Sequence, residues 1–161
     1  MLLYEIVDVL NEKKIKFAIV GGYALALQGI IRATIDVDVV LSLSLSEFEA
    51  AEKALRDIKL QSRIPVRAKD IITMREEYIK NRNLIAWSFV DYQDPSRQVD
   101  ILITKDVRDL NVEKISVGKY KIPVASLEDL LKMKINTGRP QDLVDVANIK
   151  EKLNEKKNNK K

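Results

Sequence analysis

The sequence predicts a single α/β (α+β) domain, because helical and strand patterns alternate along its 161 residues. Apolar residues make up 46% of the chain, which is enough to fill one hydrophobic core. The most distinctive segment is an apolar strand that runs into two glycines and is followed by a strand with two aspartates. We expect the domain to span residues 1–153 and residues 154–161 to form a flexible lysine-rich tail.

The first half of the chain alternates helices with strands. Apolar residues at three- and four-residue spacing indicate an opening helix, and runs of β-branched residues indicate two strands. Ser46 followed by Glu49 matches a capping box, which marks the start of a longer helix. The expected elements are a helix over residues 2–10, a strand over 16–20, a short helix over 23–27, a strand over 35–41, and helices over 46–57 and 70–79.

The second half of the chain predicts two hairpins followed by two helices. Two runs rich in β-formers flank residues 94–96, an Asp-Pro-Ser turn signal, and Gly118 indicates a smaller hairpin. Ser126 with Asp129 caps one helix, and Pro140 suits the first turn of the next. The expected elements are strands over 84–92, 98–103, 114–117 and 120–124, and helices over 126–136 and 139–153.

The net charge of +4 belongs to the end of the chain. From Lys150 onward, six lysines stand against two glutamates, so the rest of the chain carries no net charge. A neutral body argues against a large nucleic-acid interface. The lysines indicate either a solvated end or a sequence-independent contact with phosphate.

The chain contains neither cysteine nor histidine. Thiolate nucleophiles, Ser-His-Asp triads and zinc sites built from Cys and His are therefore excluded. Any metal must be held by oxygen ligands, which favours Mg²⁺ or Mn²⁺.

The sequence shows no signal peptide and no membrane span. The first ten residues include Glu5 and Asp8 and have no long apolar run. The longest uncharged stretch, residues 17–31, contains two adjacent glycines and is too short to cross a bilayer. We expect a cytoplasmic protein without a membrane partner.

The candidate site begins with Asp36 and Asp38, which strand alternation places on one face. Asp100 is the natural third member, because it is a lone carboxylate within the apolar run 99–103. Three carboxylates in contact repel one another, so without a cation at least one should hold a proton. Two Mg²⁺ ions would reverse this cost and support phosphoryl chemistry, with Mn²⁺ as the alternative. The backbone amides of the Gly21-Gly22 turn suit the phosphates of a nucleotide.

These motifs resemble the DNA polymerase β-like nucleotidyltransferase superfamily. Val20-Gly21-Gly22 is followed, after thirteen residues, by Asp36-Val37-Asp38-Val39, and Asp100 lies in a later strand. The resemblance implies a nucleotidyltransferase fold, a small mixed β-sheet flanked by helices. It also implies that the glycines hold a triphosphate, that Asp36 and Asp38 bind both metals, and that Asp100 binds one metal and helps deprotonate the acceptor.

A narrower resemblance covers most of the chain. It is similar to the minimal nucleotidyltransferases of the AbiEii toxin type, which implies membership of a toxin-antitoxin system with a cognate antitoxin as partner. The segments that carry this resemblance are residues 21–25, 32–38 and 125–130, together with Lys134, Arg139, Pro140, Asp142 and Asp145.

This second resemblance adds residues to the nucleotide site. It implies that Lys134 and Arg139 bind the triphosphate, and that Arg32 and Thr34 support the phosphates or the aspartate strand. Many members have serine after the two glycines, where this chain has Tyr23. The tyrosine hydroxyl offers a phosphate contact of different reach.

Several residues allow a second interpretation. Asp91, on the strand before Asp100, is the rival third carboxylate. Asp142 and Asp145 share a helix face and suggest either a second metal site or partners for Arg139.

Two further side chains have a plain structural alternative. Lys134 is either a phosphate ligand or a solvated lysine. Trp87 is expected in the core rather than in a stacking platform for a base.

Three functions fit these observations. The first is an Mg²⁺-dependent enzyme, a transferase that moves a nucleoside monophosphate from a nucleoside triphosphate such as ATP to RNA, including tRNA, to a protein or to a small molecule, releasing pyrophosphate. The second is a nucleotide-sensing or toxin-antitoxin interaction module with the same fold and no transfer. The third, a carboxylate-metal nuclease, leaves the glycine turn without a purpose.

Overall fold

The computed structural model describes residues 1–135 and 137–160. Within these ranges, helices and strands alternate as the sequence predicts. The helices are α1 (Leu2–Glu12), α2 (Gly21–Leu27), α3 (Leu45–Asp57), α4 (Ala68–Thr73), α5 (Arg75–Arg82), the 3₁₀ helix η1 (Val107–Asp109), α6 (Leu127–Ile135) and α7 (Pro140–Asn159). The strands are β1 (Phe17–Val20), β2 (Val37–Leu41), β3 (Gln61–Ser62), β4 (Ala86–Asp91), β5 (Asp94–Leu102), β6 (Val112–Val117) and β7 (Tyr120–Ala125).

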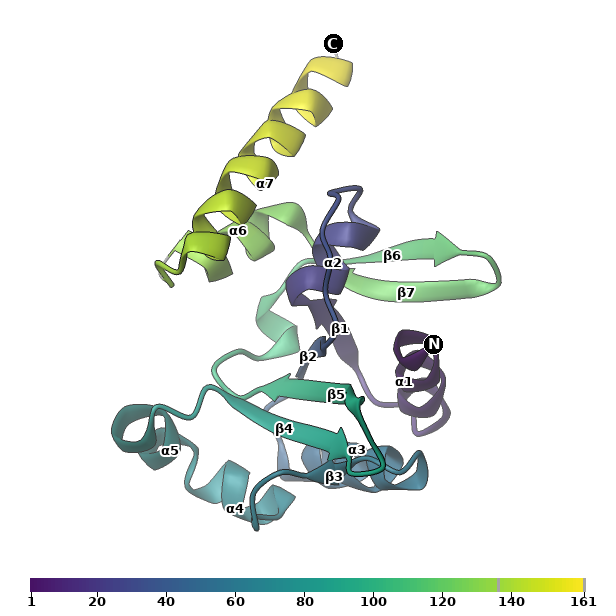
Figure 1. Cartoon of the computed structure of the whole chain (residues 1–161), viewed down its shortest axis with the longest axis vertical. Helices are drawn as coiled ribbons and strands as arrows, with labels where there is room; N and C mark the ends of the chain where they lie inside the picture. Colours follow the sequence, from purple (N-terminus) through teal and green to yellow (C-terminus); the bar gives the residue numbers. More distant parts are fainter. Residues whose placement is uncertain (136, 161) are drawn as a thin grey trace.

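The described strands form one mixed sheet in the order β3-β4-β5-β2-β1-β7-β6. β2 runs parallel to β5 and β1 runs parallel to β7, whereas the other neighbours are antiparallel. Figure 1 shows α3, α4 and α5 beside strands β3 to β5, and α2, α6 and α7 at the other end of the molecule. The predicted fold class, a mixed sheet flanked by helices, is confirmed.

The core is centred on aromatic side chains of α3 and β4. Trp87 is fully buried, stacks on Phe48 with ring centroids 6.2 Å apart and meets Phe89 edge-on. Its indole nitrogen donates to the Ser62 hydroxyl at 2.9 Å, so burial leaves no polar atom of this ring unpaired. The prediction that Trp87 belongs to the core is confirmed.

The turn of the first hairpin lies two residues earlier than predicted. The turn is at residues 92–93, where the Asp91 carboxylate accepts a hydrogen bond from the Gln93 amide at 2.9 Å. Asp94 already pairs with Asp91, and residues 95–97 form an irregularity before the ladder resumes. Pro95 is tolerated there because a bulge does not need its missing amide proton.

The largest differences between predicted and observed helix boundaries concern α3, the pair α4 and α5, and α7. α3 is capped by Ser44, whose hydroxyl accepts from the Glu47 amide at 3.4 Å, so the expected cap at Ser46 is wrong. The helix expected over residues 70–79 is two helices that meet at Met74, where the backbone leaves helical geometry. α7 continues to Asn159, so residues 154–159 of the expected tail are helical, and Figure 1 shows this end of α7 leading away from the sheet.

No helix in the described ranges is long and apolar enough to cross a bilayer.

Candidate active site

Four neighbouring strands align the residues of the acidic cluster in one row. Asp38 lies opposite Val20 of β1 and also pairs with Asp100 of β5, which in turn pairs with Ser88 of β4. Because paired residues on adjacent strands face the same side, the Asp38 and Asp100 carboxylates meet. Asp36 comes just before β2 and lines the same cleft. We call Asp36, Asp38 and Asp100 the carboxylate row.

The glycine turn is packed too tightly for any side chain. Gly21 has a φ of 69°, and a Cβ atom there would lie 2.0 Å from the Asp38 Oδ2 atom. At Gly22, an added Cβ would lie 2.1 Å from the Arg32 Nη1 atom and 2.7 Å from the Thr34 Cβ atom. The first glycine therefore allows the left-handed backbone and the close carboxylate, and the second leaves room for Arg32 and Thr34.

Asp100 is held in place by two polar neighbours. The Ser88 hydroxyl donates to its Oδ1 atom at 2.6 Å, and the Gln98 amide donates to the same oxygen at 3.1 Å. Gln98 in turn accepts from the Arg63 guanidinium at 3.1 Å. The rival carboxylate, Asp91, instead pairs with an arginine near the turn and does not line the cleft.

Two carboxyl groups of the row, Asp36 and Asp38, have raised pKa values. Burial raises the pKa of Asp38 to about 7, and the charges of Asp100 and Asp36 add to this shift while Lys134 opposes it. Burial and the Asp100 charge also raise the pKa of Asp36, against a smaller effect of Arg63. The expectation that one carboxyl would be protonated without a cation is therefore supported.

The donor set of the row suits a hard divalent cation. All the candidate ligands are carboxylate oxygens, and a cation would favour the charged forms of Asp36 and Asp38, which burial and mutual repulsion disfavour. Within the described ranges, however, no three acidic side chains are arranged as a ready metal site. Asp38 and Asp100, which contact each other, are the best-placed ligands, and a ligand role for Asp36 stays a prediction.

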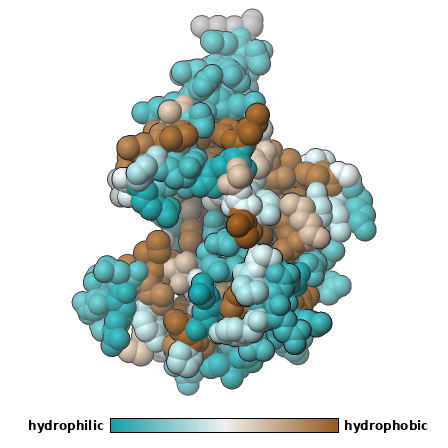
Figure 2. Space-filling view, in the orientation of Figure 1, coloured by the Kyte–Doolittle hydropathy of each residue, from teal (hydrophilic) through white to brown (hydrophobic). Residues whose placement is uncertain are grey.

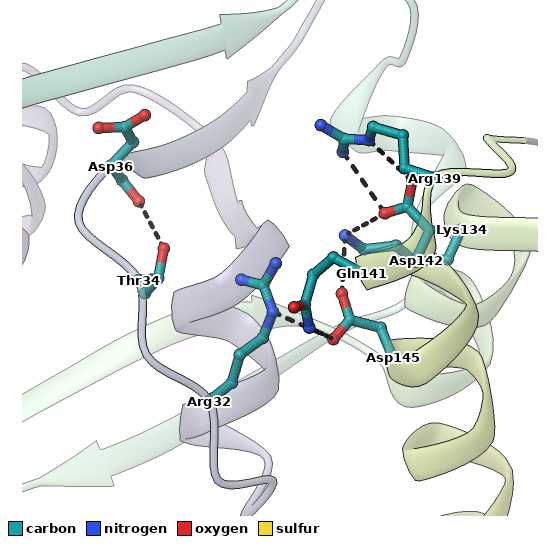
Figure 3. Close-up of polar contacts among 8 residues, drawn as sticks. All are labelled: Arg32, Thr34, Asp36, Lys134, Arg139, Gln141, Asp142 and Asp145. Carbon is teal, nitrogen blue, oxygen red and sulfur yellow. Dashed lines mark hydrogen bonds and ion pairs between the residues drawn. The ribbon is translucent and has the colours of Figure 1, made fainter.

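A second cluster faces the row from α6, α7 and the loop before β2. Figure 3 shows Arg32, Lys134 and Arg139 directed toward two acids of α7. Lys134 Nζ lies 3.1 Å from a carboxylate oxygen of both Asp142 and Asp145. Arg139 Nε lies 2.9 Å from Asp142, and Arg32 Nε lies 3.0 Å from Asp145. We call Arg32, Lys134 and Arg139 the cation cluster.

The two acids of α7 are fully buried and paired with cations. Both Asp142 and Asp145 are 1% exposed in their side chains. Burial alone would raise the pKa of Asp142, but hydrogen bonds from Arg139 and Lys134 hold it well below its usual range. The interpretation of these acids as ion-pair partners is thus supported, because their charges are already matched by the cations.

The surroundings of Lys134 exclude one of its two interpretations, that of a solvated lysine. Its side chain is only 13% exposed and bonds to buried carboxylates, so it is not a solvated surface lysine. Arg139, in contrast, keeps a side chain that is 74% exposed while it pairs with Asp142. Both residues line the cleft, as does Arg32.

The row and the cluster line one cleft of about 480 Å³. Figure 2 shows the surface hollowed between the part formed by α6 and α7 and the part below it. Tyr23 is not among the lining residues and packs against the core, so its phosphate role stays a prediction. The predicted site residues that line the cleft are Gly21, Gly22, Arg32, Thr34, Asp36, Asp38, Asp100, Lys134 and Arg139.

Solved structures with a similar fold are nucleotidyltransferases. The lincosamide antibiotic adenylyltransferase LnuA with lincomycin bound matches with a TM-score of 0.62 at 16% identity, over 92% of this chain and 94% of that one. ANT(2")-Ia in complex with adenylyl-2"-tobramycin matches with a TM-score of 0.65 at 10% identity, over 97% and 90%. An antigenic nucleotidyltransferase-like protein from Paracoccidioides brasiliensis matches with a TM-score of 0.55 at 16% identity, over 89% and 71%. At these identities the likeness shows a nucleotidyltransferase fold.

The family is shown by the sequence itself. The profile of the family described as "Nucleotidyl transferase AbiEii toxin, Type IV TA system" matches residues 2–159. The chain therefore belongs to the AbiEii nucleotidyltransferase family. A comparison with curated proteins found no match.

Proposed function

We propose that this protein transfers a nucleoside monophosphate from a nucleoside triphosphate to an acceptor hydroxyl. The hydroxyl oxygen bonds to the α-phosphorus, and its proton passes to a carboxylate. The bond from that phosphorus to the bridging oxygen breaks, and pyrophosphate leaves with the electron pair. The observation that carries this proposal is that the carboxylate row and the cation cluster line one cleft beside the glycine turn.

The cation cluster suits the triphosphate. Arg139 has an exposed guanidinium anchored by Asp142, which positions it to bind phosphate oxygens without losing its orientation. Lys134 and Arg32 supply charge from less exposed positions. The backbone amides at Gly21 and Gly22, together with Thr34, complete the proposed phosphate site.

The carboxylate row suits the reacting atoms. When bound, Mg²⁺ would neutralise the row and stabilise negative charge on the attacking and leaving oxygens. Asp38 and Asp100 would hold the ion, with Asp36 as a further ligand. Ser88 and Gln98 keep one oxygen of Asp100 engaged, which directs its other oxygen to the metal or to the acceptor proton.

Labelled transfer tests the proposal. With Mg²⁺ and α-labelled triphosphates, the wild type should label an acceptor in a pool of RNA, protein or small molecules. Asp36→Asn, Asp38→Asn and Asp100→Asn should each abolish the labelling. Asp57→Asn is the matched control, because this acid pairs with Lys13 on the surface.

A module that binds nucleotide without transfer is the second candidate. It is favoured by the position of Tyr23 outside the cleft lining and by the lack of a ready three-acid metal site in the described ranges. Normal triphosphate binding with no transfer to any pool would support this candidate. Cleavage of nucleic acid without triphosphate would instead indicate a nuclease.

The biological setting follows from the family. Because the family is described as a type IV toxin-antitoxin toxin, we propose that this chain acts as the toxin of such a pair in the cytoplasm. Expression of the wild type should slow growth, and Asp38→Asn should relieve the effect. Growth inhibition that persists in this variant would contradict a toxic role for the transfer reaction.

A further inference from the structure

The end of the cleft beside Asp100 is lined by apolar side chains, unlike the end where the cation cluster is proposed to bind the triphosphate. Ala86 and Leu102 are cross-strand partners, two residues along from Ser88 and Asp100 on the same face of β4 and β5. Both line the cleft, and Ile85, which is 59% exposed, stands next to them. The surface beside the reacting carboxylates is therefore an apolar platform.

The charged side chain at this platform is Lys105. It lines the cleft together with Thr104, in the loop that follows β5. Within residues 1–135 and 137–160, Lys105 forms no ion pair, whereas Lys134 and Arg139 are both matched by Asp142. Its positive charge is available to a ligand.

A second cation lies close to this loop. Arg75 donates from Nε to the backbone carbonyl of Ile103, two residues before Lys105. This contact holds the guanidinium near the strand end. Two cations, Lys105 and Arg75, therefore lie at the end of β5, whereas Asp106 of the same loop is paired with Arg108 and does not line the cleft.

Few acidic groups in the cleft are free to attract a cationic acceptor. Apart from the carboxylate row, the acid that lines the described cleft is Asp142, which is buried and paired with Lys134 and Arg139. A polycationic acceptor would be repelled by Lys105, and no unpaired carboxylate outside the carboxylate row lines the described cleft to attract it. The charge of this end therefore favours an anionic acceptor.

We propose that the platform and Lys105 form an acceptor subsite for a hydroxyl compound that also carries a phosphate group. This inference rests on the proposed transfer reaction. Ala86 and Leu102 contact the sugar or ring of the acceptor, and Lys105 pairs with its phosphate. That phosphate takes no part in the bond changes and serves only to select the acceptor.

Matched acceptor pairs test the subsite. The probes are a nucleoside 5′-monophosphate and its nucleoside, a short oligoribonucleotide that ends in the same nucleoside, and tobramycin as a polycation. Transfer of labelled nucleotide gives kcat/KM for each probe. Binding of each probe is measured separately in the presence of Mg²⁺ and a non-hydrolysable triphosphate analogue, so that this readout does not need turnover.

The expected result is a preference for phosphate that depends on Lys105. The phosphorylated probes should be favoured by about tenfold over the nucleoside, the usual size of one charge-assisted contact. Lys105→Glu should remove this preference, so that the nucleotide and the nucleoside are used equally. Lys114→Glu, on the exposed edge strand β6, makes the same charge change away from the cleft and should have no effect.

The outcomes separate the subsite from the reaction. Equal use of nucleoside and nucleotide, better use of tobramycin, or an unchanged preference in Lys105→Glu would overturn the subsite while leaving the transferase intact. Lys105-dependent binding of the phosphorylated probes without any transfer would support the subsite and overturn the reaction. A strong advantage of the oligoribonucleotide over the free nucleotide would assign the phosphate to a nucleic-acid end, and equal use would assign it to a small metabolite.

Discussion

The carboxylate row and the cation cluster face each other across one cleft, yet they are built in opposite ways. The row is fixed by strand register, and burial together with the charges of Asp100 and Asp36 raises the pKa of Asp38 to about 7. The cluster is fixed by ion pairs to buried acids of α7, which hold the pKa of Asp142 low. The carboxylate row keeps like charges close together, whereas the charges of the cation cluster are balanced by Asp142 and Asp145.

This difference indicates separate roles for the two regions in the proposed reaction. An acidic row that is unstable by itself gains from a cation, so metal binding and folding energy are linked there. A cation cluster whose internal pairs are complete keeps its shape whether or not a triphosphate is bound. We therefore expect substitutions in the row to remove chemistry, and substitutions in the cluster to remove structure and nucleotide affinity.

The largest effect is expected from Asp38→Asn. Transfer should fall by at least about 1,000-fold, since charge stabilisation at the reacting atoms is lost. Arg139→Gln should chiefly raise the KM for the triphosphate, because it removes a phosphate ligand. The buried Asp142 stays paired with Lys134 in this variant, so its charge is not left without a partner. Steady-state kinetics of both variants check this contrast, and equal effects on kcat would contradict it.

Asp145→Ala should give the largest loss of stability. It leaves Arg32 and Lys134, which are 18% and 13% exposed, without a shared buried partner. Breaking such a pair costs about 3 kcal/mol in the free energy of unfolding. Glu76→Ala, which removes an exposed pair with Lys80, should change stability by less than about 0.5 kcal/mol. Urea unfolding of both variants provides the measurement.

The two regions should give opposite slopes of stability against pH. Because the pKa of Asp38 is raised by folding, its contribution is most favourable below about pH 4 and is lost as the pH rises to about 7. The pKa of Asp142 is lowered, so its contribution is present above its ordinary value and is lost in stronger acid. Asp38→Asn should raise the stability at pH 8, without Mg²⁺, by about 2 kcal/mol. Unfolding at pH 4 and pH 8 checks the sign, and equal gains at both values would refute it.

Among the substitutions in the site, the smallest effect is expected from Ser88→Ala. This change removes one of the two donors to Asp100 Oδ1 and leaves Gln98 in place. The loss should be about 1 kcal/mol in stability, with a modest decrease in kcat. Unfolding and transfer assays with Ser96→Ala as control provide the comparison, because the Ser96 hydroxyl also donates to an aspartate but is exposed and lies away from the cleft.

The sequence predicted the row better than the cluster. Alternation placed Asp36 and Asp38 together, and the isolation of Asp100 among apolar residues identified the third member. The role of Ser88 was missed because it depends on which residue of β5 lies opposite Ser88. The hairpin turn was predicted at residues 94–96, and a turn there would pair Ser88 with a residue other than Asp100. A short-range pattern shows which face a side chain takes, but not which residue lies opposite.

The cluster depends on contacts far apart in the chain. Arg32 meets Asp145 across more than a hundred residues, where α7, which packs on α6, reaches the loop before β2. The spacing of Asp142 and Asp145 suggested a shared helix face but could not show that both are buried. Lys105 was missed because a single lysine in a loop has no pattern that distinguishes it from a solvated one.

In the proposed reaction, the carboxylate row and the cation cluster act on one metal-bound triphosphate. Calorimetric titration of a non-hydrolysable triphosphate analogue, with and without Mg²⁺, tests it most directly. Mg²⁺ should raise affinity by at least about tenfold in the wild type, Asp38→Asn should remove this gain, and Arg139→Gln should weaken binding with and without the ion. Affinity that is independent of Mg²⁺ in the wild type, or unchanged in both variants, would contradict it.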